Sequence, residues 1–327
     1  MHKDVYTPWR LSIGIAVACC LAPCLAQAAD GAVESTVGNA PHSPVDVVEI
    51  QTEDVTRFYQ VYEAAGQHPT AEQLQREYID PGTDGLHHLM KVRNVTAERI
   101  AKAIDTQPAL YTEARDCMAA LPRVRERLNV AFGKLVDLYP NSQKPPVTIF
   151  VGRGRPVAIS SPGAGVQIGL EAICSPMARR LNPDVDDRFV YITAHEYIHS
   201  QQDPKLSLDE HPTVLERSLL EGAAEFMGEM ISGDVGYGVF RTSTKGHELE
   251  IETRFAADID KTDLSDWEDN TTADKLGDLG YWVGYRIVKS YYQHAPDKRR
   301  AIREIIQMND AHAFLQKSGW HPGMVLK

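Results

Sequence analysis

The chain of 327 residues lacks the positive charge that nucleic-acid binding needs. Lys and Arg total 34 against 45 Asp and Glu, which gives a formal net charge of -11. A negative surface works against nonspecific attraction to nucleic acid and to anionic membranes. We therefore expect no nucleic-acid partner.

A phosphate-binding loop is also missing. Glycines stand at positions 152, 154, 163, 165 and 169, but no GK[ST] or GxGxxG sequence leads into a helix. These glycines therefore predict turns and close backbone approach. No internal repeat is present.

No apolar run reaches the roughly 20 residues that a membrane-spanning helix needs. The run at the N-terminus extends only from Leu11 to Leu25, follows Lys3 and Arg10, and precedes the AxA sequence at 26–28. This arrangement is typical of a cleavable signal peptide over residues 1–28. We expect a mature start near Ala29, a periplasmic or secreted protein, and no stable membrane insertion after cleavage.

Cysteine is scarce in the predicted mature chain, because Cys19, Cys20 and Cys24 lie in the signal peptide. Lipid attachment at one of these three is the less favoured alternative, since Pro23 directly before Cys24 fits such a site poorly. Cys117 and Cys174 remain, and either a disulfide or two free thiols is compatible with an exported protein.

The rest of the chain predicts one domain over residues 45–327, after a flexible leader at 29–44 that is rich in Gly, Ser, Pro and Asn. Apolar spacing of three and four residues predicts a helical part at 45–140. The β-branched stretches VTIFVG (147–152) and VQIGL (166–170) predict a small sheet at 146–173, and helical patterns return at 184–327. The fold class is therefore α+β.

The sequence HEYIH contains residue types that can bind a metal ion and activate water on it. Asn182 and Asp184 are typical helix-start residues, so this stretch lies inside a helix. Residues four apart share a helix face, and His195 and His199 can therefore offer two imidazole nitrogens to one tetrahedral metal ion. Glu196 lies beside that face, where a general base acts on metal-bound water.

A following helical stretch, TVLERSLLEGAAEFMGEMI (213–231), supplies a third ligand, a glutamate. Glu221 and Glu225 lie four apart on one face, and a carboxylate among small and apolar residues needs a partner. We expect the small residues around Gly222 to let this helix approach the HEYIH helix closely.

These motifs carry a resemblance over about residues 70–295. HEYIH followed by LEGAAEF is similar to the gluzincin metallopeptidases. With VTIFVG, GVQIGLE and YWVGYRIV, the chain resembles a bacterial family of predicted zinc-dependent proteases that is distantly related to a gliding-motility lipoprotein. The resemblance implies a zincin-like domain and one zinc ion per chain, held by His195, His199 and Glu221, with Glu225 outside the ligand set.

The resemblance also implies an activity, an exported zinc metallopeptidase in which Glu196 is the general base. Tyr281, and secondarily Tyr285, would then donate a hydrogen bond to the oxyanion. The substrate would be a peptide or protein, laid along the edge of the small sheet at GVQIGLE. Leu220 departs from the Asn of aminopeptidase relatives, which weakens an aminopeptidase assignment.

Two other classes of function stay open: a non-catalytic periplasmic binding or assembly protein that keeps zinc for structure, and a metallohydrolase acting on a non-peptide amide or ester. The oligomeric state is also open. Two acidic features are interpreted as solvated, namely Glu171 at the end of its strand and the loop at 258–278.

Overall fold

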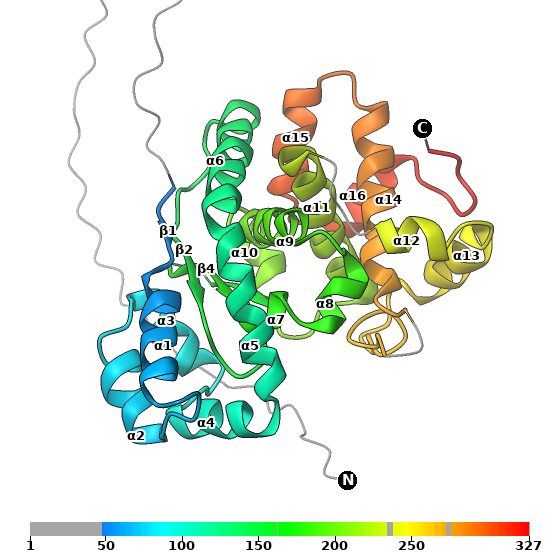
Figure 1. Cartoon of the computed structure of the whole chain (residues 1–327). Helices are drawn as coiled ribbons and strands as arrows, with labels where there is room; N and C mark the ends of the chain where they lie inside the picture. Colours follow the sequence, from blue (N-terminus) through cyan, green and yellow to red (C-terminus); the bar gives the residue numbers. More distant parts are fainter. Residues whose placement is uncertain (1–47, 162, 234–237, 273–275, 327) are drawn as a thin grey trace, which may run out of the picture. The chain divides into compact units, whose positions relative to one another are not determined.

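Figure 1 shows the computed structural model, which describes residues 48–161, 163–233, 238–272 and 276–326. The predicted signal peptide at 1–28 and leader at 29–44 lie outside the described residues. Residues 46–327 group as one compact unit by their contacts. No described helix is both long and apolar enough to cross a lipid bilayer.

A small sheet accompanies the helices, so the class is α+β, as predicted. Its first strand precedes the N-terminal helices and lies in a part of the chain predicted to be helical. The elements before β2 are β1 (Ile50–Gln51), α1 (Glu53–Ala64), α2 (Ala71–Leu74) continued by a π-helical turn (Gln75–Ile79), α3 (Asp84–Val92), α4 (Ala97–Thr106), α5 (Pro108–Cys117), a short 3-10 turn (Met118–Ala120) and α6 (Leu121–Leu138). These helices form because their apolar residues recur on one face, and α2, α3 and α4 also have capped first turns. In α4, for instance, the Thr96 side chain accepts a hydrogen bond from the Arg99 amide.

The sheet has the strand order β1-β2-β4-β3, with β2 at Val147–Phe150, β3 at Ala158–Ser161 and β4 at Gly165–Gly169. β2 runs parallel to β1 and β4, and β3 is antiparallel to β4. β2 and β4 lie where the β-branched stretches predict strands. β3 escapes prediction because it has only four residues, two of them serine, inside turn-rich sequence.

The expectation that GVQIGLE forms the edge of the sheet is wrong. β4 is hydrogen-bonded on both sides, to β2 and to β3, and β3 is the edge strand next to it. Sequence could not show this, because the edge position depends on the unpredicted strand β3.

Glu171 is also misplaced by the sequence interpretation. Its side chain is fully buried in α7 (Leu170–Ile173) and accepts a hydrogen bond from the Gly154 amide at 2.9 Å. Burial raises the pKa of this carboxyl, although the amides of Gly152 and Gly154 oppose the shift. Glu171 therefore holds the loop after β2 in place and is not a solvated strand-end charge.

The second half of the chain is helical. It comprises α8 (Pro176–Leu181), α9 (Val185–His199), α10 (Pro204–Ser207), α11 (Val214–Ser232), α12 (Gly238–Ser243), α13 (Glu248–Asp258), α14 (Leu279–His294), α15 (Lys298–Ile306) and α16 (Ala311–Ser318). α9 packs against β3 and β4, and it also packs against α11. α11 in turn packs against α14, so that α11 lies between the HEYIH helix and the C-terminal helices (Figure 1).

Cys117 and Cys174 form a disulfide, which resolves the alternative left open by the sequence. The bond joins the end of α5 to the residue after α7, with the two Cα atoms 6.5 Å apart. It therefore ties the N-terminal helices to the segment that follows the sheet.

Removing this disulfide should destabilise the fold. The bond closes a loop with a sequence separation of 57 residues, so Cys117→Ala with Cys174→Ala should lower the free energy of unfolding by roughly 2–4 kcal/mol, because the unfolded chain regains freedom. Urea unfolding of the oxidised protein and the double variant measures the difference. An unchanged unfolding midpoint would show that the bond contributes nothing.

Candidate metal centre

The helix that bears HEYIH begins where its sequence predicts. The Asp184 side chain accepts a hydrogen bond from the Asp187 amide at 2.8 Å and caps the first turn of α9. The helix continues without a break to His199, so His195 and His199 lie on one face. His195 is 8% exposed and His199 is half-buried.

The neighbouring helix α11 is capped at both ends. Thr213 and Glu216 form a reciprocal capping box at its start, and Gly233 ends it with a left-handed φ of 96°. Gly228, not Gly222, lies against the HEYIH helix: a Cβ at Gly228 would lie 3.2 Å from the His195 amide nitrogen. The expectation that Gly222 serves this approach is therefore wrong.

Gly222 instead contacts α14. A Cβ at Gly222 would lie 2.1 Å from the carbonyl carbon of Gly284, and one at Gly284 would lie 1.7 Å from the Ser218 carbonyl oxygen. Both contacts are with backbone, so no side chain can be added without separating the helices. The two glycines bring α14 against the helix that carries Glu221.

The three predicted ligands meet between α9 and α11. The Nε2 atoms of His195 and His199 lie 3.1 Å apart, and the Glu221 Oε2 atom is 3.2 Å from the first and 3.1 Å from the second. Ligand atoms about 2.05 Å from a tetrahedral zinc ion are roughly 3.3 Å from one another. The arrangement therefore fits a divalent metal ion with two imidazole ligands and one carboxylate ligand.

The outer nitrogens of both imidazoles face acceptors. His199 Nδ1 lies 2.7 Å from Gln202 Oε1, and the Gln202 amide donates to the Leu220 carbonyl oxygen at 2.7 Å. His195 Nδ1 lies 3.1 Å from Glu225 Oε1, at ion-pair distance but without hydrogen-bond alignment. A proton on each Nδ1 leaves the Nε2 lone pairs directed at the shared centre, which is the tautomer that a metal requires.

Electrostatics also favours a cation at this point. Burial by itself raises the pKa of the Glu221 carboxyl, but His199 and Arg217 hold that pKa well below its usual range. Burial lowers the pKa of His199, whereas the Glu221 carboxylate outweighs this effect and raises it to about 9. Without metal the two groups form an ion pair, and a divalent ion replaces the shared proton.

Glu225 is a different kind of carboxyl from Glu221. Burial, together with Glu229, raises its pKa well above the usual range, and the Tyr191 hydroxyl donates to it. A carboxyl kept neutral at neutral pH is a poor metal ligand. Glu225 therefore contacts the outer side of His195 and is not one of the three groups whose atoms converge.

Two residues of the centre were not anticipated from the sequence. Arg217 Nη2 lies 2.8 Å from the second oxygen of Glu221, and Arg217 Nε donates to Glu268 Oε2 at 2.8 Å. Glu268 is 6% exposed, so the interpretation of the loop at 258–278 as solvated is wrong at this position. The i, i+4 spacing of Arg217 and Glu221 was a usable signal, whereas Glu268 is 47 positions beyond Glu221 in the sequence.

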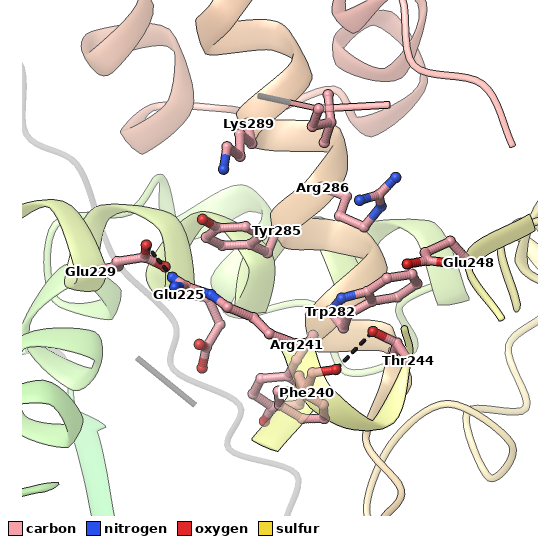
Figure 2. Close-up of a pocket in the computed structure, with 12 residues that line it drawn as sticks. Glu225, Glu229, Phe240, Arg241, Thr244, Glu248, Trp282, Tyr285, Arg286 and Lys289 are labelled. Atoms are coloured by element: carbon pink, nitrogen blue, oxygen red, sulfur yellow. Dashed lines mark hydrogen bonds and ion pairs between the residues drawn. The ribbon is translucent and has the colours of Figure 1, made fainter. Parts of the chain in front are cut away.

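Tyr281, Tyr285 and Glu196, to which the resemblance gave catalytic roles, each have different neighbours. The Tyr281 ring stacks on the His195 ring with centroids 6.1 Å apart and an interplanar angle of 16°. Tyr285 lies beyond it, near Phe226 and Lys289, at a cavity of about 210 Å³ that Glu225 and Tyr281 also line (Figure 2). Glu196 is half-buried, and its charge adds to the rise in the pKa of His199.

Comparison with known proteins gives one family match. Residues 252–322 match the family described as "Gliding motility protein GldB". None of the curated proteins and none of the solved structures matches the chain.

This match corrects the assignment drawn from the resemblance. The family that matches is a gliding-motility family and not a family of zinc proteases, so the identification as a gluzincin-like metallopeptidase is wrong. The prediction of a hydrolase, whether it acts on peptides or on another amide or ester, is overturned by the same finding. The catalytic roles given to Glu196, Tyr281 and Tyr285 depended on that activity and are not carried further.

Metal binding can be tested apart from any activity. Purified protein should hold about one zinc ion per chain, and His195→Ala, His199→Ala or Glu221→Ala should each weaken binding by more than roughly 100-fold, because each removes a ligand. Glu225→Ala should weaken zinc binding only about 10-fold, because Glu225 contacts the ligand His195 and not the metal itself. Elemental analysis and competition with a chromophoric chelator measure both quantities.

The contrast between the two glutamates decides the assignment. If Glu225→Ala strips the metal while Glu221→Ala retains it, the third ligand has been chosen wrongly.

Proposed function

We propose that the protein is a non-catalytic, zinc-binding protein of the cell envelope that acts in gliding motility. Zinc, held by His195, His199 and Glu221, would join α9 to α11. The arrangement of these helices behind a small sheet would be zincin-like, with the metal retained for structure and assembly in place of hydrolysis.

The observation that carries this proposal is the place of the family match in the fold. The matched segment at 252–322 supplies Glu268, which bonds Arg217, Tyr281, which stacks on His195, and Gly284, which packs on Gly222. The part of the chain that resembles the motility family is thus in contact with both helices of the metal centre.

Zinc suits a structural role here because it would add to the ion pairs and close packing that already hold α9 against α11. When bound, a zinc ion supplies a strong, directional link between imidazole and carboxylate ligands and contributes directly to folding free energy. Gln202 and Glu225 would orient the histidines, and Arg217 would orient the glutamate. A structural zinc site is normally closed by four ligands, so with three from this chain the fourth would come from an assembly partner.

The location proposed is the cell envelope, with lipid attachment near the N-terminus. The short name of the matched family, GldB_lipo, denotes a lipoprotein. This supports lipid attachment to a cysteine, the alternative that the sequence favoured less. Ala18, a small residue, stands directly before Cys19, whereas Pro23 precedes Cys24.

Gliding itself tests the function. Cells of the source organism that lack the gene should lose surface gliding, and the wild-type gene should restore it. His195→Ala with His199→Ala should fail to restore gliding because the metal link is lost. Glu196→Gln should restore it fully, since the carboxylate next to the ligands has no role in a non-catalytic centre. Time-lapse tracking of cells on a solid surface provides the measurement.

Two outcomes would contradict the proposal. Normal gliding without the gene would remove the motility role. Loss of gliding with Glu196→Gln, in a variant that retains zinc and normal abundance, would restore a catalytic role and overturn the structural one.

Anchoring is tested by substitution in the N-terminal segment. Cys19→Ala should move the protein from the detergent phase to the aqueous phase in detergent partitioning, because the acyl chains that hold it at the membrane are lost. Cys24→Ala is the matched control and should leave the partitioning unchanged. If both variants partition as the wild type does, Cys19 is not the attachment point.

A further inference from the structure

The structure assigns a positioning role to Arg217 at the proposed metal centre: it holds the second oxygen of Glu221, so that this carboxylate presents one oxygen to the metal, and Glu268 holds Arg217. The inference rests on the proposed zinc site. The contact between Arg217 and Glu268, in the loop that precedes α14, thus controls the affinity of this site for zinc.

The geometry of Arg217 places its guanidinium between two carboxylates. Nη2 lies 2.8 Å from Glu221 Oε1, and Nε lies 2.8 Å from Glu268 Oε2. Both carboxyls are buried, at 3% and 6% exposure of their side chains. A planar guanidinium with fixed donors can satisfy two such partners at once, which an ammonium group cannot do with the same geometry.

The two oxygens of Glu221 consequently have different partners. Oε2 lies within 3.2 Å of both histidine Nε2 atoms, and Oε1 is bound to Arg217. Rotation of the carboxylate toward two-oxygen coordination would break the bond to Arg217 inside the protein. Arg217 therefore favours coordination through Oε2 alone.

Glu268 is itself fixed by its surroundings. The neighbouring Trp267 side chain is 1% exposed, and its carbonyl oxygen accepts a hydrogen bond from the Gly280 amide at 3.0 Å, at the start of α14. Trp267 Nε1 also donates to Asp258 Oδ2 at 3.1 Å. The loop residue that holds Arg217 is thus part of the packed core, and its position does not depend on solvent-exposed contacts.

Two effects of Arg217 on zinc affinity oppose each other. Its positive charge repels a cation, whereas its hydrogen bond orients the ligand. Burial raises the pKa of Glu268 to about 7. Above that pH its carboxylate, in direct contact with Arg217, compensates the charge, so we expect orientation to dominate there. Loss of a group that orients a metal ligand weakens binding by roughly 10–100-fold.

The experiment measures zinc dissociation constants of the full chain by competition with a chromophoric chelator. Arg217→Met removes both the positive charge and the hydrogen bonds. Arg217→Lys keeps the charge but loses the planar guanidinium that bonds both carboxylates. Both should weaken binding by roughly 10–100-fold if orientation dominates. Thermal unfolding without metal identifies any variant that fails to fold.

A matched control is available on α6. Arg127 pairs with Asp187 of α9 at 2.6 Å, eight residues before His195. Arg127→Lys should leave zinc affinity unchanged, because this ion pair lies about 12 Å along the helix from the ligand.

A double-mutant cycle tests whether Glu268 acts through Arg217. Glu268→Gln should weaken zinc binding in the wild type and should do so less in the Arg217→Met background. A direct electrostatic attraction between Glu268 and the metal would give an equal or larger effect in that background, and would overturn the inference. If Arg217→Met is unstable, the same cycle is run in the Arg217→Lys background, in which the bonds of the guanidinium are also lost.

The remaining outcomes are distinguishable from failure of the proposed function. If the wild-type chain binds no zinc, or Glu221→Ala binds as tightly as the wild type, the metal site itself fails. If the wild type binds and Glu221→Ala does not, but Arg217→Met binds equally or more tightly, only the positioning role is wrong.

Discussion

A carboxylate buried between two helices is the interaction on which the second half of this protein depends. Glu221 is 3% exposed and is surrounded by two imidazoles and one guanidinium. An unpaired charge in that position would be too costly to retain. The helices α9 and α11 must therefore pack so that these partners reach it, and the capping of both helices and the close approach at Gly228 serve that geometry.

A second layer of packing connects this centre to the segment that matches the motility family. Gly222 and Gly284 allow backbone contact between α11 and α14, and the loop before α14 carries Glu268 to Arg217. The metal centre is consequently built from three parts of the chain that are far apart in sequence. The candidate histidines come from α9, the carboxylate and Arg217 from α11, and Glu268 and Tyr281 from the matched segment at 252–322.

The motif HEYIH illustrates the difference between a binding geometry and a reaction. Two histidines four apart on a helix dictate where a metal can be held, because the spacing is a property of the helix. They do not dictate what the metal does. The general-base role of Glu196 and the oxyanion role of Tyr281 came from the resemblance to peptidases, and the family match points to a different function. In the structure Tyr281 stacks on the His195 ring.

The sequence by itself determined the local features of this protein. It specified the helix start at Asp184, the placement of β2 and β4, and the shared face of His195 and His199, because each depends on capping, β-branched composition or spacing within a few residues. Spacing alone did not separate Glu221 from Glu225, and the choice of Glu221 came from the family resemblance. Only the tertiary structure decided that β3 is the edge strand, that Glu171 is buried, that Gly222 contacts α14, and that Arg217 is paired with Glu268. These features depend on contacts between residues distant in the chain, and neither periodicity nor local spacing contains information about which distant partner a side chain meets.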